Sequence, residues 1–144
     1  MTTDSIKRLL VVDDEKDIRD IYKVFLGSIG YEVLDAADGQ EALEVIRDKG
    51  LPAAIIIDLD MPTMDGLSFR RNCLEIYHEK SPPTILATSR DVYHERDLAE
   101  RVGSLNFSAT IRKPFEWGTV IAALEQVITA HYDNQKSATP GATQ

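Results

Sequence analysis

Two pairs of aspartates, one threonine and one lysine each stand at the end of a short apolar run of the sequence. These residues are Asp13, Asp14, Asp58, Asp60, Thr88 and Lys113. Carboxylates that meet at one place repel one another and raise one another's pKa, unless a cation joins them. Oxygen ligands suit Mg²⁺, which typically uses few carboxylates together with waters and phosphate oxygens. A hydroxyl and a lysine opposite them could hold phosphoryl oxygens. Together, these residue types suit the binding of a phosphoryl group.

Each of these residues also has an ordinary structural interpretation. Asp13-Asp14 alone is more often the end of a strand followed by a helix N-cap. Asp58 alone could be a turn residue, Thr88 a satisfied hydroxyl at a strand end, and Lys113 a solvated side chain before a proline. A functional interpretation is favoured only if these residues meet at one edge of a sheet. It therefore depends on the strands and helices that position them.

Short apolar runs alternate with segments of helical periodicity along the chain. The spacing of Ile18, Ile21, Tyr22, Phe25, Leu26 and Ile29 predicts an amphipathic helix that ends at Gly30. The other predicted helices are Glu41–Lys49, Leu67–Tyr77, Asp91–Val102 and a last helix that includes Val120–His131. The predicted strands are Ile6–Val12, Tyr31–Leu34, Ala53–Ile57, Thr84–Thr88 and Ala109–Arg112.

Five strands that alternate with five helices predict an α/β fold with a doubly wound, five-stranded parallel sheet. The central strands are continuous apolar runs, as expected when both faces of a sheet are covered. In such open sheets, ligands bind outside the carboxyl ends of the strands. The predicted fold therefore brings the aspartates, Thr88 and Lys113 to one edge.

Length and composition indicate a single acidic globular domain. The chain has 144 residues, of which 43% are hydrophobic and 28% are charged, and its formal net charge is −8. We expect a domain at residues 1–132 and a disordered polar tail at 133–144. The acidic balance argues against direct binding to nucleic acid or to an anionic membrane surface.

The single cysteine, Cys73, excludes an internal disulfide, and its helical spacing among apolar residues predicts a buried position. The sequence contains no Cys/His cluster of the kind that binds structural zinc. Because no segment approaches the length of a signal-peptide core or of about 18 apolar residues, we expect no membrane insertion and a cytoplasmic location.

Four segments together resemble the receiver domain of two-component response regulators. They are Val11-Val12-Asp13-Asp14, the stretch Ile57-Asp58-Leu59-Asp60-Met61-Pro62-Thr63-Met64-Asp65-Gly66, Thr84-Ile85-Leu86-Ala87-Thr88-Ser89 and Lys113-Pro114-Phe115. The likeness runs from about Lys7 to Ala130 and implies a flavodoxin-like fold with the strand order 2-1-3-4-5.

The resemblance also implies roles for individual residues. Asp58 would attack the phosphohistidine of a histidine kinase or phosphotransfer protein and become an aspartyl phosphate. Asp13, Asp14, the side chain of Asp58 and the backbone carbonyl of Asp60 would hold Mg²⁺. Lys113 would pair with the phosphoryl group, and Thr88 would donate its hydroxyl and shift the loop that follows it.

The sequence departs from the family three residues before the lysine. Receivers often have an aromatic residue there, whereas this chain has Thr110, with Phe107 three residues earlier. The resemblance implies that Arg90 and Asp60, which flank the expected site, tune the lifetime of the phosphoryl group.

The expected function is phosphorelay signalling by a domain that phosphorylates and dephosphorylates itself, rather than by a turnover enzyme. Because the sequence ends in a polar tail, the expected output is contact with a downstream protein through residues 91–126.

Three other classes of protein compete with this hypothesis. Asp58-Leu59-Asp60 also resembles the first motif of haloacid-dehalogenase-type phosphatases, but those enzymes place their second acidic pair after the lysine. A flavin-binding protein is disfavoured because the strand ends offer carboxylates to an anionic cofactor. A degenerate receiver that only binds partners is disfavoured by the intact set of Asp13, Asp14, Asp58, Thr88 and Lys113.

Overall fold

A computed structural model describes residues 8–141, in which five parallel strands form one sheet with the order β2-β1-β3-β4-β5. The strands are β1 (Arg8–Val12), β2 (Glu32–Ala36), β3 (Ala54–Asp58), β4 (Thr84–Thr88) and β5 (Ala109–Arg112). The helices are α1 (Lys16–Ser28), α2 (Gly39–Lys49), α3 (Gly66–Tyr77), α4 (Arg96–Ser104) and α5 (Trp117–Gly141), and a short 3₁₀ helix, η2 (His78–Lys80), follows α3. The doubly wound α/β fold and its strand order are confirmed.

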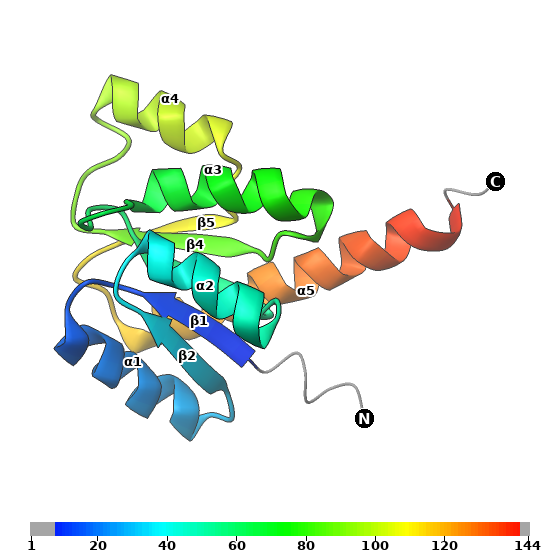
Figure 1. The fold of residues 1–144 in the computed structure, drawn as a ribbon, viewed down its shortest axis with the longest axis horizontal. Coiled ribbons are helices and arrows are strands. Elements are labelled where there is room, and N and C mark those ends of the chain that lie inside the picture. The colour runs from blue at the N-terminus through cyan, green and yellow to red at the C-terminus, as the bar shows by residue number, and fades with distance from the viewer. Residues whose placement is uncertain (1–7, 142–144) are drawn as a thin grey trace.

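Helices cover both faces of the sheet, with α2, α3 and α4 on one side and α1 and α5 on the other (Figure 1). Alternate residues of each strand point to opposite faces. In β1, for example, Leu10 and Val12 pack under α2 and α3, whereas Leu9 and Val11 pack against α1 and α5. The central strands β1, β3 and β4 are largely apolar and buried because helices cover both of their faces, as the sequence predicted. Cys73 is fully buried in the first layer, which confirms its expected position in the core.

Helix α4 begins five residues later than the sequence pattern predicts, at Arg96 instead of Asp91. The side chain of Asp91 accepts a hydrogen bond from the backbone N–H of Tyr93 at 3.2 Å and pairs with the ring of His94. These local bonds compete with helix formation, as aspartate side chains commonly do. Residues 91–95 therefore form a turn.

Helix α5 continues to Gly141 and projects beyond the sheet (Figure 1). This differs from the disordered tail expected for residues 133–144. Adding residues to an existing helix requires no new nucleation step. Pro140 and Gly141 are the first helix-breaking residues after position 132. Residues 142–144, and Ile6 and Lys7 of the first predicted strand, lie outside the described residues. Within residues 8–141, every helix is too short or too polar to cross a bilayer.

Candidate functional site

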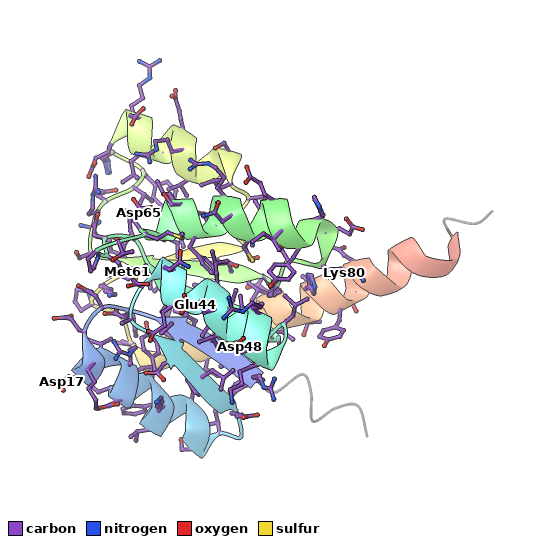
Figure 2. The ribbon with its side chains drawn as sticks, in the orientation of Figure 1. Asp17, Glu44, Asp48, Met61, Asp65 and Lys80 are labelled. Atoms are coloured by element: carbon purple, nitrogen blue, oxygen red, sulfur yellow. The ribbon has the colours of Figure 1, made fainter. Side chains whose placement is uncertain are left out.

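The register of the sheet places the predicted site residues side by side. Val12 pairs with Ile57, so the residues that follow them, Asp13 and Asp58, lie at neighbouring strand ends. Thr88 pairs with Arg112, the residue before Lys113. Figure 2 shows Met61 and Asp65 of the β3–α3 connection at this carboxyl edge of the sheet, and Lys80 at the opposite edge.

Three aspartates and one lysine meet at this edge. Carboxylate oxygens of Asp13, Asp14 and Asp58 all lie within 4.8 Å of one another. The Nζ atom of Lys113 lies 3.0 Å from Oδ2 of Asp13 and 3.4 Å from Oδ1 of Asp58. The donors are all hard oxygens with a net charge of −3 + 1 = −2, counted over Asp13, Asp14, Asp58 and Lys113. This set fits a hard divalent cation such as Mg²⁺.

Backbone contacts fix Asp13 within the edge. Its Oδ1 atom accepts a hydrogen bond from the N–H of Glu15 at 2.9 Å, and its carbonyl accepts one from Nη1 of Arg19 at 2.7 Å. Asp13 is only 2% exposed, whereas Asp14 is exposed. One carboxylate is therefore held rigidly inside the fold, and the other faces solvent.

Asp58 is positioned by the turn that follows it. Oδ1 of Asp58 accepts a hydrogen bond from the N–H of Leu59 at 2.9 Å. The N–H of Gly66 donates to the carbonyl of Leu59, which brings the start of α3 against the end of β3. A Cβ atom at position 66 would lie 2.4 Å from the carbonyl oxygen of Asp58, so only glycine fits there. Asp65 caps α3 by accepting a hydrogen bond from the N–H of Ser68.

Burial and neighbouring charge set the ionisation of the site. Burial raises the pKa of Asp58, and the charge of Asp13 raises it further, although Lys113 opposes both effects. Burial alone would lower the pKa of Lys113, but the hydrogen bond and charge of Asp13, together with Asp58, raise it overall. Lys113 therefore stays protonated and positively charged between the carboxylates of Asp13 and Asp58.

Thr88 is buried beside this cluster at the end of β4, with 1% of its surface exposed. Its Oγ1 atom accepts a hydrogen bond from the N–H of Arg90 at 3.1 Å, and its carbonyl accepts one from the N–H of Lys113 at 2.8 Å. A hydroxyl that accepts one hydrogen bond can still donate its own hydrogen. Thr88 therefore keeps the donor capacity that a phosphoryl oxygen would need.

The side chain of Asp60 lies outside the acidic cluster and is 63% exposed. Its Oδ1 atom is 3.1 Å from Nη1 of Arg90, whose Nη2 atom lies 2.6 Å from Oε1 of Glu95. The sequence prediction assigned the backbone carbonyl of Asp60 to the metal, and that remains a prediction. The role of Glu95 was missed, because a spacing of five residues matches neither of the helical pair spacings.

Thr110 and Phe107 occupy different environments. Thr110 is half-buried in β5 and pairs with Leu86 of β4. The ring of Phe107 lies under the guanidinium of Arg70, whose Cζ is 5.9 Å from the ring centroid. Phe107 is thus engaged with α3, three residues away from the position where receivers often carry their aromatic residue.

A mostly apolar cavity of about 450 Å³ adjoins the site. It lies between α1 and the start of α5 and is lined mainly by Ile18, Tyr22, Phe115 and Trp117, with Lys113 on its wall. The aromatic rings pack together, since Phe25 stacks on Trp117 with their centroids 4.6 Å apart. The acidic cluster is therefore flanked by a hydrophobic surface.

Comparison with known proteins shows similarity to one family of domains across most of the chain. The family model described as "Response regulator receiver domain" matches residues 9–125. A "Probable transcriptional regulator ycf27" from Porphyridium aerugineum is 35% identical over 124 residues, which cover 85% of this chain and 48% of the relative. The chain therefore spans about half the length of that relative.

Solved structures of single receiver domains superpose along most of the chain. The chemotaxis protein CheY4 of Vibrio cholerae has a TM-score of 0.75 at 29% identity, covering 85% of this chain and 98% of its own. The response regulator TrrA of Thermotoga maritima, in complex with Mg(2+)-BeF, has a TM-score of 0.70 at 27% identity, covering 84% and 98%.

Proposed function

Because this chain belongs to the response regulator receiver domain family, we propose that it accepts a phosphoryl group on Asp58 from a histidine kinase or phosphotransfer protein. The observation that carries the proposal is the meeting of Asp13, Asp14, Asp58 and Lys113 at the carboxyl edge of the sheet. The expected product is an aspartyl phosphate.

The chain's own residues orient the reacting carboxylate. Lys113 and the N–H of Leu59 both contact Oδ1 of Asp58, which leaves Oδ2 better placed to attack phosphorus. A bond forms between this oxygen and phosphorus while the bond from phosphorus to the donor's imidazole nitrogen breaks, and the electron pair stays with the imidazole. Lys113 then pairs with the phosphoryl oxygens, and Thr88 donates its hydroxyl to one of them.

Asp13, Asp14, the side chain of Asp58 and the backbone carbonyl of Asp60 would hold Mg²⁺. When bound, the ion would neutralise charge on the carboxylates and on the transferred group. The all-oxygen donor set with a net charge of −2 supports this assignment. A "Mg(2+)-BeF" complex is named for the relative from Thermotoga maritima.

The proposed output is a change in the contact surface formed by residues 91–126, which a downstream protein would recognise. Thr88 lies at the start of the connection that leads into this surface, so its movement would reorder the connection. The relative from Porphyridium aerugineum is called a probable transcriptional regulator, and this chain matches about half of it. We therefore propose a signalling role, with self-phosphorylation and self-dephosphorylation instead of sustained turnover of a substrate.

Intact mass after incubation with a small phosphodonor and Mg²⁺ tests this function. We expect the wild type to gain one phosphoryl group and Asp58→Asn to gain none, and chelation of Mg²⁺ should block labelling. Asp48→Asn, an exposed aspartate on α2 whose carboxylate pairs with Arg47, is the matched control and should label like the wild type.

The other outcomes correspond to the competing classes of protein. Unchanged labelling of Asp58→Asn would rule out Asp58 as the acceptor. Sustained hydrolysis of many phosphomonoesters would support the phosphatase hypothesis. A wild-type protein that never labels would be a degenerate receiver.

A further inference from the structure

Arg90 joins two elements on either side of the site. Its Nη1 atom lies 3.1 Å from Oδ1 of Asp60, on the connection that leaves β3. Its Nη2 atom lies 2.6 Å from Oε1 of Glu95, the residue immediately before α4. One guanidinium therefore links the loop that follows Asp58 to the beginning of α4.

The backbone of Arg90 is also attached to the site. Its N–H donates to Oγ1 of Thr88 at 3.1 Å, and Thr88 is almost fully buried. Because Arg90 is only two residues from Thr88, a movement of the hydroxyl must either carry the backbone of Arg90 with it or break this hydrogen bond. The same residue thus contacts the hydroxyl through its backbone and α4 through its side chain.

The side chain of Glu95 does not cap α4. It occupies the N-cap position of α4, yet its side chain makes no capping hydrogen bond and pairs with Arg90 instead. Residues 91–95 have a sequence that predicts helix, but they form a turn. Asp91 supports this turn by accepting from Tyr93 and by lying 3.6 Å from Nη1 of Arg112.

We propose that Arg90 is a positioning residue that relays phosphorylation of Asp58 to the start of α4. In the unphosphorylated chain, Arg90 holds Glu95 and keeps residues 91–95 in a turn. Phosphorylation replaces the single negative charge of the Asp58 carboxylate with a phosphoryl group of roughly −1.5 to −2, and the added negative charge attracts both the guanidinium and the hydroxyl of Thr88. Arg90 then releases Glu95, and residues 91–95 join α4. The relay rests on the proposed phosphorylation of Asp58.

Neutralising Glu95 tests the relay without touching the site. Glu95→Gln removes the carboxylate that Arg90 holds, and it removes no capping hydrogen bond. Glu100→Gln is the matched control, because Glu100 lies on the same helix and has only a 3.8 Å contact with Arg96. Backbone NMR shifts and amide exchange of residues 91–98 are measured in the full chain, before and after phosphorylation.

In the unphosphorylated state, we expect Glu95→Gln to move the shifts of residues 91–95 along the path that the wild type follows on phosphorylation. The population of the helical form should rise roughly two- to fivefold, the range expected from loss of an exposed ion pair. The response to phosphorylation should shrink accordingly, whereas Glu100→Gln should respond like the wild type.

Unphosphorylated Glu95→Gln spectra that match the wild type at residues 91–95 would overturn the relay. So would an equally large effect of Glu100→Gln. Labelling of Asp58 is followed by intact mass in the same samples, so that failure of the proposed function is seen separately, as a wild type that does not label.

Discussion

Asp58 has both a positively charged neighbour and negatively charged neighbours, whose electrostatic effects on it oppose one another. Its side chain is 15% exposed, it shares Lys113 with the more deeply buried Asp13, and Asp14 adds a third carboxylate nearby. One lysine cannot balance three carboxylates, so the edge keeps an excess of negative charge. Such an arrangement costs folding free energy and favours the arrival of a cation.

Gly66 allows the start of α3 to lie against the backbone of Asp58. Gly66→Ala should lower the free energy of unfolding by about 1–3 kcal/mol, because the new methyl group would overlap the carbonyl of Asp58. Gly103→Ala is the control, since nothing lies within 4 Å of a Cβ atom there. In that helical position alanine should stabilise by up to about 1 kcal/mol. Urea unfolding measures both, and equal effects would contradict the steric explanation.

At the scale of elements, Arg70 ties α3 to the opposite end of β4 and to the connection before β5. It is 4% exposed, and its guanidinium donates to the carbonyls of Pro82, Leu105 and Asn106 and to the hydroxyl of Thr84. Burial lowers the pKa of Arg70. Its charge is thus balanced by backbone dipoles.

Replacing Arg70 should therefore loosen this junction. Arg70→Met should lower the free energy of unfolding by about 2–4 kcal/mol, because buried carbonyls lose their donors. Arg71→Met removes the neighbouring, exposed arginine and should stay within about 0.5 kcal/mol of the wild type. Denaturant unfolding of the two variants measures this difference. Similar losses of unfolding free energy in both variants would contradict a stabilising role for the hydrogen bonds of Arg70.

An ion-pair network joins β2 to α1. Asp35 lies 2.8 Å from Nε of Arg19 and 2.9 Å from Nζ of Lys23. Burial alone would raise the pKa of Asp35, but the hydrogen bonds from Lys23 and Arg19 outweigh it and hold the pKa below its usual 3.8. Because the folded pKa is depressed, the stabilisation is present above pH 3.8 and is lost as the pH falls through the folded pKa.

Asp35→Asn should therefore cost about 1 kcal/mol at neutral pH, and less as the pH falls below 4. Urea unfolding at several pH values measures this difference. Asp48→Asn, which removes a mostly exposed pair with Arg47, should show a smaller effect at neutral pH. A cost for Asp35→Asn that stays constant down to acidic pH would contradict the electrostatic origin.

Most of the element order could be predicted from the sequence because strand and helix periodicities here are strong and separate. The strands Thr84–Thr88 and Ala109–Arg112 have the bounds that were predicted. The start of α4 could not be predicted, because it depends on side-chain bonds within residues 91–95. Helix α5 extends past position 132 because a polar segment can continue a helix that is already formed, and polar composition alone does not indicate this.

The candidate site was predictable to the extent that it follows from topology. Asp58 ends β3, and Asp13 and Lys113 directly follow β1 and β5, so the parallel sheet brings all three to its carboxyl edge. The partners of Asp60 and Arg90 depend on loop conformation, which no periodicity encodes. The role of Arg70 could not be predicted from the sequence either, because its hydrogen-bond acceptors include backbone carbonyls of distant segments.

At the scale of the whole molecule, the charge excess at the carboxyl edge should make stability depend on divalent cations. Mg²⁺ should raise the free energy of unfolding of the wild type, by about 2.7 kcal/mol at a concentration 100 times its Kd. Asp14→Asn should reduce this gain, whereas Asp17→Asn, an exposed residue at the start of α1, should keep it. Thermal unfolding with and without chelator measures the effect. Equal gains for both variants would contradict the assigned ligands.

The aromatic cluster beside the site has a practical consequence. Trp117 is the only tryptophan of the chain, and it lines the cavity that also contains Lys113. Its indole stacks on Phe25, which is 43% exposed on α1. The protein therefore contains its own fluorophore, close to the acidic edge on one side and in contact with an open helix surface on the other. Its emission can report in real time, without an attached dye, on chemistry at the edge and on a partner that covers α1.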